Sequence, residues 1–142
     1  MTEFSRAVSV RAPAAEVVRL MQAVQSWPSW NAAVSRVDRG ATGPLTVGEK
    51  VTVKQPRLPA ATWTVTAVQP SGFSWTSTSL GVRSTGDHWA QDTGDGRTTA
   101  TLTLTLTGPL AWPTGLLLAR LIRRYLRLEA EGLRTAAQRS AG

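Results

Sequence analysis

The chain has 142 residues, no cysteine and a formal net charge of +7, which comes from 16 Lys and Arg against nine Asp and Glu. This length predicts one domain, covering residues 1–142, with room for a core and a modest cavity. The lack of cysteine excludes disulfide bonds and thiolate chemistry, and a single histidine makes a metal site unexpected. We also expect no organic cofactor, since no Gly-rich phosphate loop is present.

The first third of the chain predicts one strand followed by two short helical segments. Residues 4–10 alternate apolar and polar side chains, as a half-buried strand does. Residues 12–16 open a helix, because proline is tolerated in a first turn and Glu16 suits the positive end of the helix dipole. Residues 26–31 contain a proline and are expected to form only a short helical turn.

The middle of the chain predicts further strands, at residues 34–39, 50–54, 62–68, 73–77, 82–91 and 98–107. The clearest is the last, in which Leu102, Leu104 and Leu106 alternate with threonines. Such alternation is typical of an antiparallel sheet with one buried and one solvated face. The connections are short, which also favours antiparallel pairing.

After Pro113 the period of the apolar residues changes to that of a helix, which is predicted to continue to Arg139. Its apolar side holds Leu118, Leu121, Ile122, Tyr125, Leu128, Gly132, Leu133 and Ala136. Its polar side holds Arg120, Arg123, Arg124, Arg127, Glu131, Arg134 and Gln138, with Arg127 and Glu131 spaced to pair. The helix is therefore expected to pack on the sheet by one side only.

Together these elements predict an α+β fold. A curved antiparallel sheet of about six to seven strands wraps around the long C-terminal helix, and two short helices follow the first strand. A strongly twisted sheet of this size curls, and one helix does not fill its concave side. The fold therefore predicts a cavity between sheet and helix.

Several segments resemble the polyketide cyclase/dehydrase group of the START-like (SRPBCC, helix-grip) superfamily. They are residues 12–18, 27–31, 43–48, 62–66 and 129–133, and they span nearly the whole chain. The resemblance implies the helix-grip fold and a lipophilic ligand. It does not select one function, because the superfamily includes aromatase/cyclases, lipid and quinone binders and hormone receptors.

His88, the only histidine, has the strand parity of Ser84 and Gly86, which the resemblance places on the concave face. It is either a polar group of the pocket, acting as an acid, a base or a hydrogen-bond anchor, or a core histidine satisfied by its neighbours.

Glu129 falls about 40° from Tyr125 on the helical wheel, inside the apolar stripe. A carboxylate there needs partners, and we expect either His88 or Tyr125, or else exposed amides or Arg57 at a sheet edge. His88, Glu129 and Tyr125 are accordingly the candidate catalytic residues. The predicted ligand-binding residues are Trp30, Trp63, Trp75, His88, Leu102, Leu104, Leu118, Leu121 and Tyr125.

Three functions remain open from the sequence. The first is binding of a small lipophilic molecule such as a polyketide, isoprenoid, quinone or lipid. The second is a cyclase or dehydratase reaction in which His88 and Glu129 serve as acid and base. The third is a module that contacts a membrane or partner through the arginine side of the helix, with Trp112 nearby.

The arginines lack interleaved aromatic residues and a recognition motif, so we expect no nucleic-acid partner. No signal peptide or membrane span is recognisable, and a cytoplasmic protein is expected. We expect a monomer or a homodimer.

Overall fold

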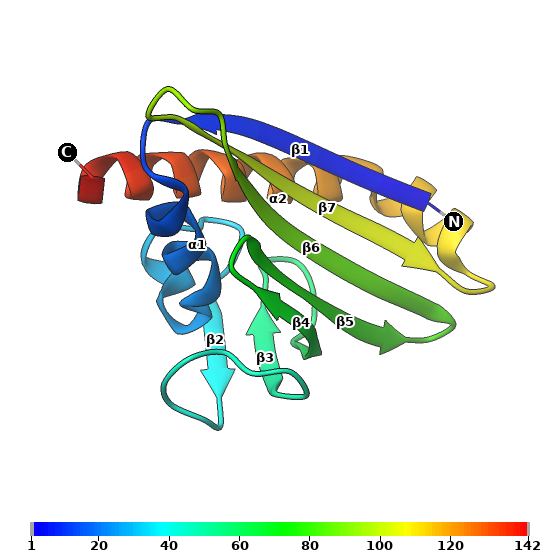
Figure 1. Cartoon of the computed structure of the whole chain (residues 1–142). Coiled ribbons are helices and arrows are strands. Elements are labelled where there is room, and N and C mark those ends of the chain that lie inside the picture. Colours follow the sequence, from blue (N-terminus) through cyan, green and yellow to red (C-terminus); the bar gives the residue numbers. More distant parts are fainter. Residues whose placement is uncertain (1, 142) are drawn as a thin grey trace.

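The computed structural model describes residues 2–141. One sheet holds seven antiparallel strands in the order β1-β7-β6-β5-β4-β3-β2, and the long helix α2 runs across it (Figure 1). This is the helix-grip architecture that the sequence predicts. The strands are β1 (Thr2–Val10), β2 (Arg36–Arg39), β3 (Lys50–Lys54), β4 (Ala61–Gln69), β5 (Gly72–Ser79), β6 (Val82–Asp92) and β7 (Thr98–Thr107), and the helices are α1 (Ala14–Gln22), the 3-10 helix η1 (Val24–Ser29) and α2 (Ala111–Ala141).

The predicted element boundaries lie within about two residues of the observed ones, and two of the differences have local causes. Strand β2 begins at Arg36 rather than residue 34, because Val34 N–H donates to the carbonyl of Asn31 and keeps this segment in a turn. Helix α2 begins at Ala111, two residues before the predicted start. Pro113 then lies in its first turn, where a missing N–H costs nothing.

The C-terminal half of α2 is seated in the core by small and apolar side chains. Ala130, Leu133 and Ala137 are fully buried in the main cluster, together with α1 residues such as Val17. Gly132 allows the closest approach, since a Cβ on it would lie 2.1 Å from the carbonyl oxygen of Trp30. This part of the helix therefore cannot move away from the sheet without breaking the core.

The N-terminal half of α2 is attached differently, along the edge formed by β1 and β7. A second cluster joins Phe4, Val82, Leu106 and Ala111, and Gly115 fits against Thr2. The helix thus meets the sheet near both of its ends. Between these two attachments the sheet curves away from α2 and leaves space.

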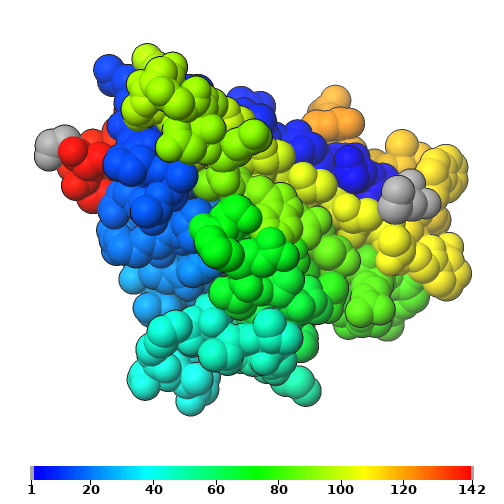
Figure 2. Space-filling model, in the orientation of Figure 1, coloured from blue at the N-terminus to red at the C-terminus, as the bar shows by residue number. Residues whose placement is uncertain are grey.

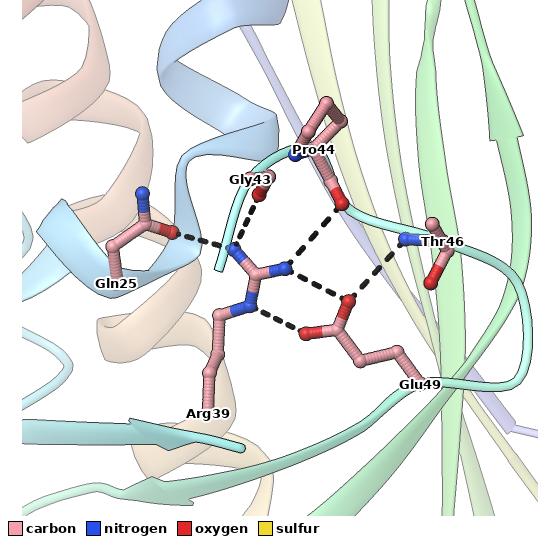
Figure 3. A network of polar contacts seen from close by, with 6 residues as sticks. All are labelled: Gln25, Arg39, Gly43, Pro44, Thr46 and Glu49. Atoms are coloured by element: carbon pink, nitrogen blue, oxygen red, sulfur yellow. Dashed lines mark hydrogen bonds and ion pairs between the residues drawn. The ribbon is translucent and has the colours of Figure 1, made fainter. Parts of the chain in front are cut away.

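A buried ion pair fixes the loop between β2 and β3 (Figure 3). The guanidinium of Arg39 donates to both carboxylate oxygens of Glu49, to Gln25 of η1 and to the carbonyl of Gly43. Both side chains of the pair are less than a tenth exposed. Arg39 therefore ties η1, the loop and the sheet together at the end of the molecule that is cyan in Figure 2.

Candidate functional site

A cavity of about 760 Å³ lies between the concave side of the sheet and the N-terminal half of α2. Its walls are mostly aliphatic and aromatic side chains, contributed by β3 to β7, by α2 and by the loop at residues 55–60. Among the residues that line it are Trp27, Trp63, Trp75, His88, Leu102, Leu104, Leu118, Leu121, Tyr125 and Glu129. The volume is within the range of sites for small organic ligands.

Strand β6 holds His88 on the inner face of the sheet, as the parity of the strand predicts. The imidazole stacks on Phe73 with ring centroids 4.4 Å apart and planes within 5°, and Trp75 meets it edge-on at 5.8 Å. Gly86, two residues earlier, leaves room for the indole of Trp75, since a Cβ there would lie 2.9 Å from Nε1. Aromatic packing therefore fixes the plane of the imidazole ring.

Glu129 reaches His88 from the opposite wall. Its Oε2 lies 3.3 Å from Nε2 of His88, and its Oε1 accepts a hydrogen bond of 3.1 Å from Nδ2 of Asn31. Asn31 is itself held, because its Oδ1 accepts the backbone N–H of Ala33 at 2.9 Å. The carboxylate inside the apolar stripe thus has two partners, one on the sheet and one on the segment after η1.

Two polar atoms at this site have no hydrogen-bond partner among the described residues. They are Nδ1 of His88 and the hydroxyl of Tyr125, and both residues are more than nine-tenths buried. Buried polar atoms are nearly always paired in folded proteins. The two atoms therefore provide unused hydrogen-bonding capacity in residues that line a mostly apolar cavity.

With one exception, every residue predicted to contact ligand lines the cavity. Trp30 does not; its ring packs 5.9 Å from that of Trp27, and its Nε1 is buried without a partner among the described residues. Trp27 takes its place in the cavity wall. Within residues 2–141, no three His, Cys, Asp or Glu side chains converge as metal ligands would.

Asn31 was not recognised as a site residue from the sequence. It stands at the end of residues 26–31, for which the sequence predicts only a short helical turn, and its partner Glu129 is 98 positions away. The available signal was a polar residue next to two tryptophans. The predicted pairing of Glu131 with Arg127 also differs, because Glu131 pairs with Arg134, one helical turn later.

A family model described as "Polyketide cyclase / dehydrase and lipid transport" matches residues 1–138. The chain belongs to this family. A comparison with curated protein sequences finds no match.

Solved structures confirm the fold. The aromatase/cyclase Zhui from a Streptomyces species superposes with a TM-score of 0.79 at 17% identity, covering 99% of this chain and 96% of that one. A START superfamily protein from Mycobacterium smegmatis gives 0.73 at 14% identity, covering 97% and 98%. The di-domain aromatase/cyclase BexL gives 0.73 at 20% identity and covers 95% of this chain but 46% of that protein. At these identities the likeness concerns the fold.

Proposed function

We propose that this family member binds a small lipophilic molecule that carries a carbonyl or hydroxyl group. The observation that carries the proposal is the pair of His88 and Glu129 in the wall of a mostly apolar cavity, with Asn31 bound to Glu129 and with Nδ1 of His88 and the hydroxyl of Tyr125 unpaired. The apolar walls favour a lipophilic ligand, because burying its apolar surface contributes favourably to the free energy of binding. Each unpaired atom favours a polar oxygen on that ligand as its hydrogen-bond partner.

Direct binding of the fluorescent probe 8-anilinonaphthalene-1-sulfonate to the protein tests this binding function. Ser84 lines the cavity from β6, whereas Thr85, its neighbour, points to the other face. We expect Ser84→Phe to fill the cavity and weaken probe binding by about tenfold or more, and Thr85→Phe to leave it unchanged. Equal probe binding by both folded variants would contradict the location of the site.

A second function, acid–base catalysis of ring closure in a polyketone, is favoured by one observation. Glu129 and His88 approach to 3.3 Å inside the cavity. This is the spacing of a catalytic base, here His88, and a carboxylate that orients it, here Glu129. In this proposal the Glu129–His88 pair acts as the base that removes a proton from a carbon next to a carbonyl. Tyr125, which also lines the cavity, would donate a hydrogen bond to the developing enolate oxygen.

Heptane-2,4,6-trione is a simple probe for this chemistry. Its intramolecular aldol condensation forms one carbon–carbon bond, releases one water and gives 5-methylresorcinol, which chromatography detects. We expect the protein to raise the rate above that in buffer, and His88→Gln to return the rate to the buffer value. A wild-type protein that binds the anilinonaphthalene probe without accelerating the condensation would show that the cavity binds and does not catalyse.

A further inference from the structure

Large apolar side chains are exposed together at one end of the molecule. Leu80 is 88% exposed, Leu117 84%, Trp112 70% and Leu116 69%, and Leu110 is half exposed. They come from the turn between β5 and β6, from the connection between β7 and α2, and from the first two turns of α2. An apolar group of this kind on a protein surface marks an interaction site far more often than a single exposed leucine does.

Backbone contacts bring these segments together. Leu110 N–H donates to the carbonyl of Gly81 at 3.1 Å, and the side chain of Leu110 lies against Gly81. The β5–β6 turn and the start of α2 therefore form one end of the protein, at the right in Figures 1 and 2. We name Leu80, Leu110, Trp112, Leu116 and Leu117 the apolar tip.

The apolar tip borders the cavity. Leu80 and Leu110 both line it while remaining exposed, and Leu118, one residue beyond the tip, lines it as well. A lipophilic molecule that left the cavity at this end would contact apolar side chains before it contacted water.

Leu80 is also held in an unfavourable backbone conformation. Its φ is +46°, in the left-handed region, and Gly81 follows at +79°. A turn with two such residues favours Asn-Gly, and leucine at its first position is costly both in conformation and in exposed apolar surface. Because Leu80 is 88% exposed, packing of its own side chain offsets little of this cost, which favours a role for the side chain in a contact outside the chain.

Positive charge lies next to the apolar tip on the same side of α2. Trp112 and Leu116 are followed along this side by Arg120, Arg123 and Arg127, all exposed. The sequence has no acidic residue between Asp95 and Glu129, so every charged side chain in the first half of α2 is an arginine. The helix is thus apolar where it begins and cationic immediately after, as in helices that lie on anionic lipid.

We propose that this end of the protein docks on an anionic membrane surface. The apolar tip enters the interfacial region, the arginines pair with lipid phosphates, and the end of the cavity bordered by Leu80 and Leu110 faces the bilayer. The role of this geometry in passing a ligand between bilayer and cavity rests on the binding function proposed above, whereas the docking does not. Side chains that project from three separate segments suit a deformable lipid surface better than a flat protein partner.

Co-sedimentation with phosphatidylcholine vesicles, with and without an equal share of phosphatidylglycerol, tests the docking. We expect the wild-type protein to bind the anionic vesicles preferentially and to be released by salt. Leu116→Ser with Leu117→Ser, or Arg120→Glu with Arg127→Glu, should each weaken binding by about tenfold or more. Val47→Ser, and Arg11→Glu with Arg139→Glu, make the same kinds of change elsewhere on the surface and should leave it unchanged.

Leu80→Asn separates docking from folding, because it gives the turn its preferred Asn-Gly sequence. We expect this variant to be at least as stable as the wild type in urea and yet to bind vesicles more weakly. Wild-type protein that binds neither vesicle, or that self-associates through the leucines instead, overturns the proposal. Leu116→Ser with Leu117→Ser should retain binding of the anilinonaphthalene probe, so that failure of docking and failure of the cavity function are read separately.

Discussion

Glu129 on α2 and His88 on β6 meet across the cavity, with 3.3 Å between carboxylate and imidazole. The contact joins the helix to the sheet at the point where the apolar walls are interrupted. Asn31 holds the second carboxylate oxygen, so Glu129 is directed at His88 from a fixed position. The polar centre of the cavity therefore depends on a residue from the segment after η1, outside both the sheet and α2.

Replacing Asn31 by alanine should release this arrangement. The buried N–H of Ala33 would lose its acceptor and Glu129 would lose a donor, which predicts a loss of about 1–3 kcal/mol in the free energy of unfolding. Urea denaturation measures it. Ser29→Ala removes an exposed hydrogen bond of the same region and should change stability by less than about 0.5 kcal/mol. Equal effects of the two substitutions would contradict the bridging role of Asn31.

Arg39→Ala should be among the most destabilising substitutions at a charged residue. It leaves Glu49 buried and unpaired and frees the loop shown in Figure 3, at a cost of about 3–5 kcal/mol. The matched control is Arg36→Ala, whose pair with Asp38 is exposed on the same strand and contributes about 0–1 kcal/mol. A similar urea midpoint for both variants would show that the network does not hold the loop.

The acid limb of the stability curve should depend on Glu16. Hydrogen bonds from Arg19 and Ser140 lower the pKa of Glu16 from 4.5 to about 2. Because the folded pKa is the lower one, the stability that Glu16 contributes is complete above pH 4.5 and is lost as the pH falls toward 2. We expect Glu16→Gln to reduce stability at pH 6 and to flatten its decline below pH 4.5. Parallel pH profiles for the two proteins would contradict this.

Gly132→Ala should destabilise the protein although alanine is the better helix former. The new Cβ would lie 2.1 Å from the carbonyl oxygen of Trp30, and displacing the helix costs about 1–3 kcal/mol, more than the gain in helix propensity of about 1 kcal/mol. Gly40→Ala is the control, since nothing lies within 4 Å of its Cβ position. Thermal unfolding of both variants decides the point, and a stabilised Gly132 variant would refute the close contact.

The fold could be predicted because its signals are local. The strand at 98–107 and the long helix are each defined by a period that few other structures share. The site could be predicted where such a period gives the side-chain direction, as for Trp75 and Glu129, and for His88 where the family resemblance places its strand parity on the concave face. The second partner of Glu129, Asn31, and the position of Trp30 depend on where η1 packs, and that is decided by contacts between residues about 100 positions apart.

Helix α2 lines the cavity with one set of side chains and packs against the rest of the protein with another. Leu118 and Leu121 face the cavity without belonging to either buried cluster, whereas Gly115, Ala130 and Leu133 seat the helix. Replacing the two leucines by alanine would enlarge the cavity, and replacing them by phenylalanine would make it smaller. Neither change would alter the residues that pack the helix against the sheet. Substitutions at these two positions of one helix, by natural divergence or by design, would thus change the volume of the cavity and the length of molecule that it accepts.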